Sequence, residues 1–365
     1  PCLSACPAGV DVPGFVALVG EKRYAEALKH HRDKNPFASV CARVCFHTCE
    51  EKCRRASLDE AVSIRGVKRF MVDQEVTVQV PEVRENPENA KRKIAVIGAG
   101  PAGLACAFFL ARLGYRPDVF ESEVRPGGML VQAIPAYRLP REELAREVRM
   151  IERLGVTIET GQTLGRDFTL ADLRDRGYEA VFLAVGAPDG TPLAIPGSDA
   201  KGVTDAMAFL RHYNIRGSVP VGKQVAVIGG GNAAIDAART AIRLGARSVT
   251  VLYRRTREEM PAYAEEIEEA LQEGVTLRTL LHPESFAVEN GAVAGVRCRP
   301  MKLGEFDPSG RRRPELDDAA LDLIPADQVI VAIGQKLKAR PLAKPLDLEL
   351  TERGWIKADP RTGRT

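Results

Sequence analysis

The sequence predicts an α/β protein in which a helical N-terminal domain precedes two βαβ domains. A repeated pattern predicts the βαβ domains: an apolar run, a glycine-rich turn and a helical segment follow one another twice, with the turns starting at Gly98 and Gly229. The N-terminus is distinguished by its cysteines, because six of the eight lie before residue 54. The interval between the two turns is far longer than a solenoid repeat, which indicates two separate domains.

Composition and charge are those of an ordinary globular chain. Hydrophobic residues make up 45% and charged residues 28% of the 365 residues, which excludes global disorder. The 52 basic and 49 acidic residues leave a net charge of +3, which argues against nucleic-acid or membrane-surface binding. No apolar run approaches the ~20 residues of a membrane helix, and no secretory signal opens the chain. We therefore expect a cytoplasmic protein without a membrane span.

Residues 1–75 have the pattern of helices. The segment from Phe15 to His31 carries an apolar stripe at roughly helical spacing, which predicts a helix there. We expect His30 and His31, in the polar part of this stretch, at the surface. Residues 76–91 are polar and interrupted by proline, which is typical of a linker. These features predict a helical domain over residues 1–85.

The first βαβ unit consists of a strand at Ile94–Ile97, a helix at Leu104–Leu113 and a strand at Asp118–Phe120. Its turn is Gly98-Ala99-Gly100-Pro101-Ala102-Gly103. In such a turn the first glycine permits the bend, the second lets a pyrophosphate approach, and the third lets helix and strand pack closely. The pyrophosphate would lie at the helix N-terminus, and Glu121 would bind a ribose hydroxyl. A tight turn without a ligand is the alternative.

The second βαβ unit consists of a strand at Val225–Ile228, a helix at Ala233–Leu244 and a strand at Ser248–Tyr253. Its turn is Gly229-Gly230-Gly231-Asn232-Ala233-Ala234. Here Arg254 and Arg255 stand where the first unit has an acid. Arginine attracts a ribose 2′-phosphate that a carboxylate would repel, so this turn favours NADP(H). The alternative is a solvated run of charge balanced by neighbouring glutamates.

Opposite ribose chemistry at the two turns predicts two different dinucleotides. The acid-bearing site suits FAD, whose ribose has a free 2′-hydroxyl, and the arginine-bearing site suits NADPH. Hydride transfer from nicotinamide to flavin requires no acid, base or nucleophile from the protein, because the cofactors hold that chemistry. The sequence therefore identifies no catalytic side chain.

The N-terminal cysteines predict a metal centre, since a disulfide framework is typical of small secreted proteins. Cys2 and Cys6 form a C-x3-C-P motif, and a second group follows C-x3-C spacing throughout, which on a helix would place neighbouring thiols on one face. This second group is Cys41, Cys45, Cys49 and Cys53. The pattern favours iron–sulfur clusters over zinc, although two four-iron clusters require eight ligands and six cysteines are present.

The chain resembles the small (beta) subunit of glutamate synthase and its relatives, which include the N-terminal half of dihydropyrimidine dehydrogenase. The resemblance covers essentially the whole chain. It is carried by the motifs CLSACPAGVDVPGF (2–15), CARVCFHTCEEKC (41–53), AVSIRGVKRF (61–70), AVIGAGPAGLACA (95–107), PGGMLVQAIPAYRLP (126–140), AVIGGGNAAIDAARTAIRLGA (226–246), YRRTREEMPA (253–262) and VIVAIGQ (329–335).

The resemblance implies cofactors and their contacts. Cys2 and Cys53 would ligate one [4Fe-4S] cluster, whose other ligands lie upstream in relatives. Cys6, Cys45 and Cys49 would ligate a second, whose fourth ligand in some relatives is Gln or Glu in the segment aligned with Lys68. Because lysine is a poor ligand, either Cys41 or an incomplete site is expected here. Further implied contacts are Gly128, Met129, Arg138 and Leu164 for FAD, and Asn232, Ala233, Ala332, Ile333 and Gly334 for NADP(H).

The resemblance also implies domains of the pyridine nucleotide-disulfide oxidoreductase type. FAD would occupy a discontinuous domain formed by residues 92–215 and 330–365, and NADP(H) a domain over residues 216–329. Relatives continue past a segment like IKADPRTGRT (356–365), so we expect further chain at both ends.

We therefore expect an electron-entry flavoprotein that passes electrons from NADPH through FAD to [4Fe-4S] clusters and a larger catalytic or electron-accepting subunit in a hetero-oligomer. Its reaction would resemble that of glutamate synthase (NADPH). The alternatives are the flavin subunit of another multi-subunit or electron-bifurcating iron–sulfur enzyme, a dihydropyrimidine-reducing enzyme, and a non-enzymatic scaffold. The absence of a C-x2-C pair argues against a thioredoxin-reductase-like enzyme.

Overall fold

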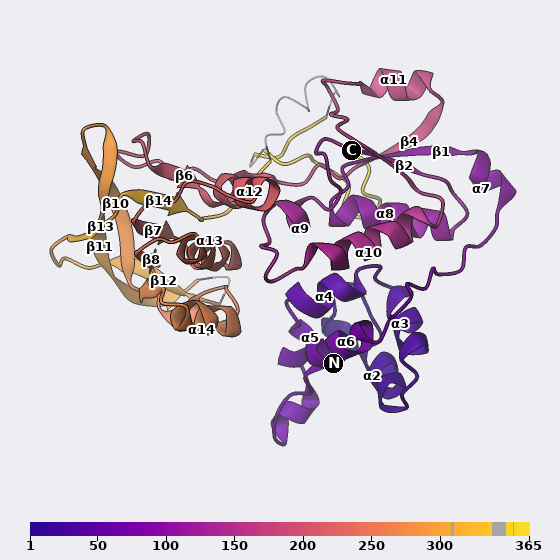
Figure 1. The fold of residues 1–365 in the computed structure, drawn as a ribbon, viewed down its shortest axis with the longest axis horizontal. Coiled ribbons are helices and arrows are strands. Elements are labelled where there is room, and N and C mark those ends of the chain that lie inside the picture. Colours follow the sequence, from indigo (N-terminus) through magenta and orange to yellow (C-terminus); the bar gives the residue numbers. More distant parts are fainter. Residues whose placement is uncertain (308–309, 338–347, 353) are drawn as a thin grey trace. The chain divides into compact units, whose positions relative to one another are not determined.

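The computed structural model describes residues 1–307, 310–337, 348–352 and 354–365 (Figure 1). Its contacts divide the chain into two units. The first contains Pro1–Val131, Ala136–Gly186 and the described part of Ala339–Thr365, and the second contains Gln132–Pro135 and Ala187–Lys338. In the described part of the chain no helix is both long and apolar enough to cross a membrane.

The first unit begins with short helices that bury their apolar faces against one another, with Phe15, Leu28 and Met71 almost fully buried at the centre. The predicted helix at Phe15–His31 is in fact two helices, because the chain turns between them with Lys22 in the left-handed conformation (φ 61°). The elements are α1 (Cys2–Ala5), α2 (Val12–Gly20), α3 (Tyr24–Arg32), α4 (Ala38–Val44), α5 (Thr48–Glu51), η1 (Arg54–Ser57), α6 (Ile64–Asp73) and α7 (Pro87–Lys91).

A parallel sheet of order β3-β2-β1-β4 follows in the same unit. Val96 of β1 lies opposite Val119 of β2 and Phe182 of β4, so the predicted βαβ unit is confirmed with its register. The strands are β1 (Lys93–Ile97), β2 (Asp118–Glu121), β3 (Thr157–Thr160) and β4 (Tyr178–Leu183). The helices are α8 (Pro101–Arg112), α9 (Met129–Gln132), α10 (Arg141–Glu152) and α11 (Leu170–Asp175).

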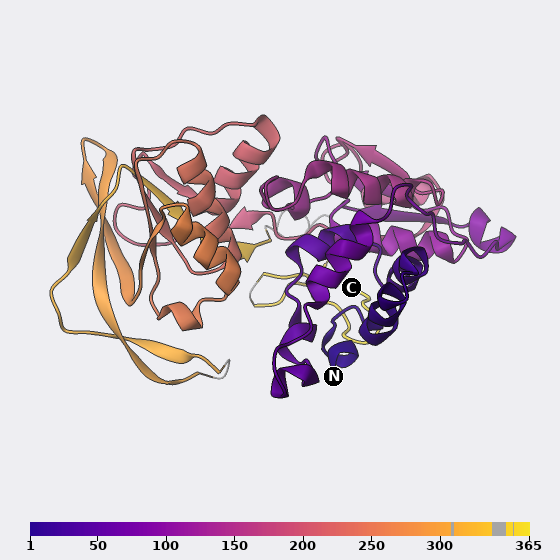
Figure 2. The ribbon, with the colours of Figure 1, turned by 60° about the horizontal axis from the view of Figure 1, so that its bottom comes forward.

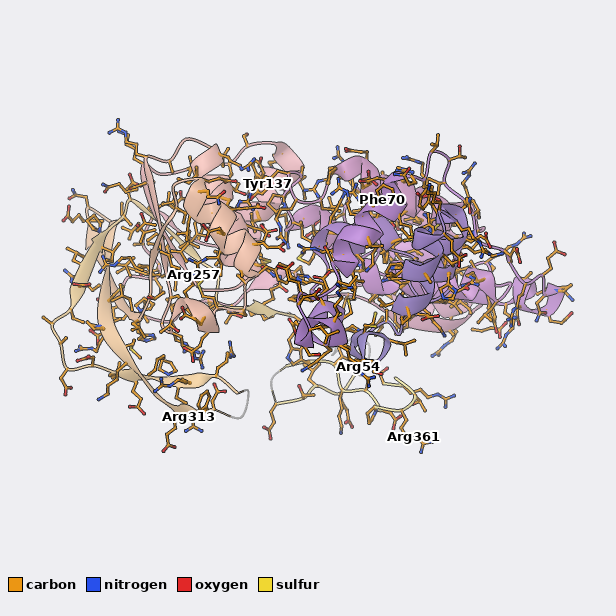
Figure 3. All side chains as sticks on the ribbon, turned by 90° about the horizontal axis from the view of Figure 1, so that it is seen from below. Arg54, Phe70, Tyr137, Arg257, Arg313 and Arg361 are labelled. Carbon is orange, nitrogen blue, oxygen red and sulfur yellow. The ribbon has the colours of Figure 1, made fainter. Side chains whose placement is uncertain are left out.

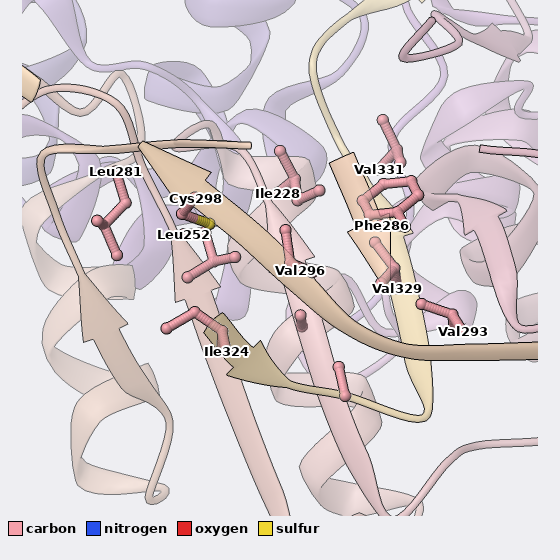
Figure 4. Packing of buried hydrophobic residues seen from close by; sticks show 12 residues of the cluster. Ile228, Leu252, Leu281, Phe286, Val293, Val296, Cys298, Ile324, Val329 and Val331 are labelled. Atoms are coloured by element: carbon pink, nitrogen blue, oxygen red, sulfur yellow. The ribbon is translucent and has the colours of Figure 1, made fainter. Parts of the chain in front are cut away.

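The second unit contains a parallel sheet of order β6-β14-β7-β8-β9, which confirms the second βαβ unit. One face packs against antiparallel strands through Phe286, Val296 and Ile324 (Figure 4), and helices α12 and α13 cover the other face (Figures 1 and 2). The elements are β5 (Asp189–Gly190), β6 (Val203–Asp205), α12 (Ala206–Arg216), β7 (Gln224–Ile228), α13 (Asn232–Arg243), β8 (Ser248–Leu252), η2 (Arg257–Glu259), α14 (Ala264–Gln272), β9 (Thr276–Arg278), β10 (Leu281–Glu289), β11 (Ala292–Phe306), β12 (Arg312–Leu316), β13 (Asp322–Pro325), β14 (Gln328–Val331) and β15 (Gln335–Lys336).

The domain bounds that the resemblance implies stay a prediction. By their contacts, residues 187–215 belong to the second unit. The reason is strand pairing: β6 pairs in parallel with β14, which in turn pairs with β7. Local sequence patterns do not reveal such pairings, because the partners lie more than a hundred residues apart.

The buried carboxyl group of Glu147 joins the helical region to the first sheet's helices within the same unit. Glu147 of α10 is 1% exposed and accepts hydrogen bonds from the backbone N–H groups of Ser39 and Val40, at the start of α4. Beside it, Glu143 accepts a hydrogen bond from the Ser39 hydroxyl (2.6 Å) and pairs with Arg43 (2.9 Å). Burial raises the pKa of Glu147 to about 8, although the two backbone hydrogen bonds oppose this shift.

This raised pKa predicts a pH-dependent stability. Between the ordinary glutamate value of 4.5 and about pH 8, folded Glu147 retains a proton that the unfolded chain has lost, so stability falls as the pH rises. Glu147→Gln mimics the protonated acid, and its free energy of unfolding should fall less steeply over this range. Urea denaturation at several pH values measures the slope, and Glu152→Gln on exposed α10 surface serves as control. An unchanged slope in Glu147→Gln would contradict the assignment.

Candidate cofactor sites

The first glycine turn has the geometry of a dinucleotide site. A Cβ at Gly98 would collide with the Ala184 carbonyl oxygen, and one at Gly103 would collide with the Gly98 carbonyl oxygen. At Gly100, by contrast, the nearest atom to a Cβ would be Gly128 Cα at 3.9 Å. The first and third glycines are therefore required for packing, whereas the second leaves open space at the N-terminus of the twelve-residue helix α8, where a pyrophosphate would bind.

The sides of this turn are formed by Glu121 and a second glycine loop. Glu121 Oε2 accepts from Ala99 N (2.7 Å), and Oε1 accepts from Glu123 N (2.8 Å), so the carboxylate is fixed beside the turn. Oε1 also accepts from the Ser122 hydroxyl (3.2 Å), whereas Oε2 retains a lone pair that can accept from a ribose hydroxyl. Gly127 N donates to Ala99 O (2.8 Å), which brings Gly128 against Gly100.

The other expected flavin contacts lie in different environments. Met129 begins α9 and is half-buried, as is Arg138. Leu164 belongs to the core cluster with Ile97 and Phe120, so only its backbone is available to a ligand. The set therefore remains a prediction, in which Leu164 would act through main-chain atoms.

The second glycine turn repeats the geometry of the first. A Cβ at Gly229 would collide with the carbonyl oxygen of Ala332, which directly follows β14 and so lies beside this turn, whereas Ile333 and Gly334 remain predicted contacts. At Gly231 the nearest atom to a Cβ would be Pro261 Cγ at 3.9 Å, so the backbone at the start of α13 is open. The Asn232 side chain is already engaged, since its Oδ1 accepts from Tyr263 N (3.1 Å).

The two arginines after β8 differ in their surroundings. Arg255 is buried, its Nη2 pairs with Asp307 (2.9 Å), and its Nε donates to the Arg312 carbonyl oxygen (2.7 Å). Arg254 is exposed. The neighbouring Arg257, labelled in Figure 3, pairs with Glu268. Arg255 is thus engaged with neighbouring groups of the chain, whereas the Arg254 side chain is exposed, and the binding of a 2′-phosphate by either arginine stays a prediction.

The N-terminal cysteines do not share one helix, contrary to the spacing argument. Cys41 lies in α4, which ends before Cys45, and Cys49 lies in α5. His47 adopts a left-handed conformation (φ 39°) and separates the two helices. All eight cysteines are free thiols.

Four of the cysteines nevertheless lie close enough to influence one another's protonation. The Cys41 thiol forms a hydrogen bond with Cys45, which raises the pKa of Cys41 and lowers the pKa of Cys45 to about 5. Burial raises the pKa of Cys49, and the nearby charges of Cys45 and Cys6 raise it further. Within the described residues, no three or more Cys, His, Asp or Glu side chains are placed to hold a single metal ion. That result concerns a single ion such as zinc, whereas in a [4Fe-4S] cluster each of the cysteine ligands binds a different iron.

The remaining pair, Cys2 and Cys53, lies at the edge of the helical core. Backbone N–H groups of Val62, Arg55 and Ala56 lower the pKa of Cys53, in that order of influence. Cys2 packs against the core cluster together with Cys6. Such N–H donors stabilise a thiolate, which is the form that ligates iron.

Sequence reasoning missed the burial of His31 and the part played by Asn35. His31 is fully buried rather than exposed, and burial lowers its pKa to about 3. Its helical spacing from Ala27 and Leu28, both buried, would have revealed this. Asn35 Nδ2 donates to Cys41 Sγ (3.3 Å), a local contact across the turn after α3 that cysteine spacing alone does not indicate.

Two family descriptions match the chain. Pyridine nucleotide-disulphide oxidoreductase matches residues 92–365, and dihydropyrimidine dehydrogenase domain II, 4Fe-4S cluster, matches residues 1–80. The glutamate synthase [NADPH] small chain of Escherichia coli (strain K12) is 34% identical over 371 residues, which cover 98% of this chain and 78% of that protein.

A further relative is the beta subunit of the NADP(+)-dependent formate dehydrogenase of Moorella thermoacetica, which is 41% identical over 386 residues. That alignment covers 99% of this chain and 54% of the relative, so the chain spans about half the length of this protein. Among solved structures, FprA of Mycobacterium tuberculosis in complex with NADPH aligns with a TM-score of 0.58 over 74% of both chains. Its 19% sequence identity shows a shared fold.

The steric role of the third glycine predicts the effect of a methyl group there. Gly→Ala in a helix ordinarily stabilises by about 1 kcal/mol, but Gly103→Ala forces a methyl onto the Gly98 carbonyl and should destabilise by about 1–3 kcal/mol. Bound flavin, measured by visible absorbance after gel filtration, should fall with it. Gly20→Ala, where a Cβ meets no atom within 4 Å, is the control. Full flavin content and unchanged stability in Gly103→Ala would refute the role given to this glycine.

Proposed function

The chain belongs to the pyridine nucleotide-disulphide oxidoreductase family, with a 4Fe-4S domain at its N-terminus, and we propose that it is the electron-entry subunit of a larger enzyme. Membership of these families implies binding of FAD and NADP(H) and of a 4Fe-4S cluster. In the proposed function, electrons enter from NADPH at the second glycine turn and leave through the N-terminal cysteines to a partner subunit.

The observation that carries this proposal is the contrast between the two glycine turns. Glu121 is fixed beside the first turn, where it suits a free ribose hydroxyl, whereas Arg254 is exposed after β8, where it suits a 2′-phosphate. When bound, FAD supplies the ability to accept a hydride and release its electrons singly to iron–sulfur clusters. The chain's own residues bind and orient these cofactors. The open backbone at Gly100 and Gly231 admits the two pyrophosphates, and the cysteines hold the iron.

The placement of the cysteines supports the proposed route from flavin to cluster. The cysteine-bearing helices and the first glycine turn belong to the same unit, and Glu147 of α10 fixes the start of α4, the helix that carries Cys41. The cluster domain is thus held by the flavin-binding part of the chain. Free thiols further favour a reducing compartment, and we propose the cytoplasm.

Two partners are candidates for the acceptor. A glutamate synthase-type large subunit is favoured by the 34% identical small chain, of which this chain covers 78%, and a formate dehydrogenase-type subunit by the 41% identical beta subunit. Co-purification from the native organism distinguishes them. A complex with the first partner would form glutamate from glutamine and 2-oxoglutarate, whereas a complex with the second would oxidise formate. Isolation without any partner would contradict the proposed subunit role.

The function itself is tested on the native holoprotein under anaerobic conditions. Addition of NADPH should bleach the flavin absorbance and then the broad iron–sulfur absorbance, whereas NADH should act far more slowly. A purified protein that shows neither absorbance would instead support the cofactor-free scaffold. Flavin absorbance that NADPH leaves unchanged would overturn electron entry at this site.

The role given to Arg254 predicts a change in coenzyme preference. Arg254→Ala should raise KM for NADPH by about 10-fold to 100-fold, because a charge-assisted hydrogen bond contributes about 1.5–3 kcal/mol, and should leave KM for NADH nearly unchanged. The measurement is the initial rate with an artificial electron acceptor. Arg257→Ala, which removes an exposed arginine three positions away, is the matched control. Equal losses with both coenzymes would assign Arg254 to folding instead.

A further inference from the structure

Lys68 of α6 is a buried cation among the N-terminal cysteines. It is 7% exposed, and its charge acts on Cys41, Cys45 and Cys49 together. Among the residues that the structure describes, no carboxylate forms an ion pair with it. Burying an ammonium group is costly unless an anion compensates for it, so the nearby sulfurs are the groups available to do so.

The Cys41 sulfur accepts a hydrogen bond in the same way as Cys45, one of the cysteines expected to bind iron. Cys41 Sγ accepts a hydrogen bond from Asn35 Nδ2 (3.3 Å), while Cys45 Sγ accepts one from His47 N (3.4 Å). Hydrogen bonds of this kind are the means by which a protein orients cluster sulfurs and adjusts their potential.

We propose that Cys41 is the fourth ligand of the [4Fe-4S] cluster held by Cys6, Cys45 and Cys49, and that Lys68 stands beside this cluster as its counter-charge. This inference rests on the proposed function for the presence of the cluster. Four cysteines complete the ligand set, and an ammonium group, which has no lone pair, need not serve as a ligand. Lys68 is a positioning residue: a cation stabilises the added negative charge of the reduced cluster and so raises its reduction potential.

The ligand assignment is tested by iron analysis and EPR of the full-length native protein purified anaerobically and reduced with dithionite. Cys41→Ala should lose the EPR signal of one cluster and the iron that belongs to it. Cys41→Ser, which retains an oxygen ligand, should keep that iron with an altered signal. Cys106→Ala, in α8, is the matched control and should match the wild type. Full iron content and an unaltered signal in Cys41→Ala would overturn the assignment.

The counter-charge is tested separately by redox titration followed by EPR. Lys68→Met should keep its iron but lower the midpoint potential of that cluster, and Lys68→Arg should restore it. Lys29→Met removes an exposed lysine of the same helical domain and should leave the potential unchanged. An unchanged potential in Lys68→Met would refute the counter-charge, and loss of iron in Lys68→Met with a normal far-UV spectrum would make Lys68 part of the ligand set instead.

These measurements are independent of the proposed function. Dithionite reduces the clusters without NADPH or flavin, so a failure of electron entry from NADPH would leave the iron content and potentials of the variants interpretable. In the converse case, the wild type contains flavin and accepts electrons from NADPH while the Cys41→Ala variant keeps its full iron content. That result would preserve the proposed function and refute Cys41 as a ligand.

Discussion

The close approach of backbone to backbone at two turns is the constraint on which both nucleotide sites depend. In each turn, the first glycine lies against the carbonyl oxygen of a neighbouring strand's end, Ala184 in one case and Ala332 in the other. A side chain at either place would push strand and helix apart and close the space in which a pyrophosphate meets the helix N-terminus. The two turns are thus alike in their sterics, and the chemistry that separates their ligands lies at the end of the following strand.

Charge distinguishes the two predicted nucleotides, and at each strand end it involves several groups and not a single side chain. Glu121 is immobilised beside the first turn by the backbone N–H groups of Ala99 and Glu123. At the other site, Arg255 holds the end of β8 to the region of Asp307 and Arg312, which leaves the adjacent Arg254 at the surface. One arginine therefore supports the strand end, and its neighbour is available to recognise an anion.

The sequence was most informative where structure is determined locally. Both βαβ units, their glycine turns and Glu121 could be predicted, because period and turn chemistry are properties of short segments. The breaks at Lys22 and His47 could not, since left-handed residues other than glycine depend on packing around them. The pairing of β6 with β14 and the burial of Arg255 arise from residues far apart in the chain, and a strand-end arginine has the same local sequence whether it faces a ligand or an aspartate.

The carboxyl group of Glu147 has a consequence for the order in which the polypeptide matures. Helix α4 has Phe37 at its N-cap and no side-chain cap of its own, so acceptors for Ser39 N and Val40 N come from a residue more than a hundred positions later. During synthesis the N-terminal segment leaves the ribosome first. The start of α4 therefore lacks these partners until α10 has been translated and has docked, and iron delivered before that moment would meet a thiol on an unfinished helix. Under the proposed ligand assignment, assembly of the cluster would therefore follow translation of α10.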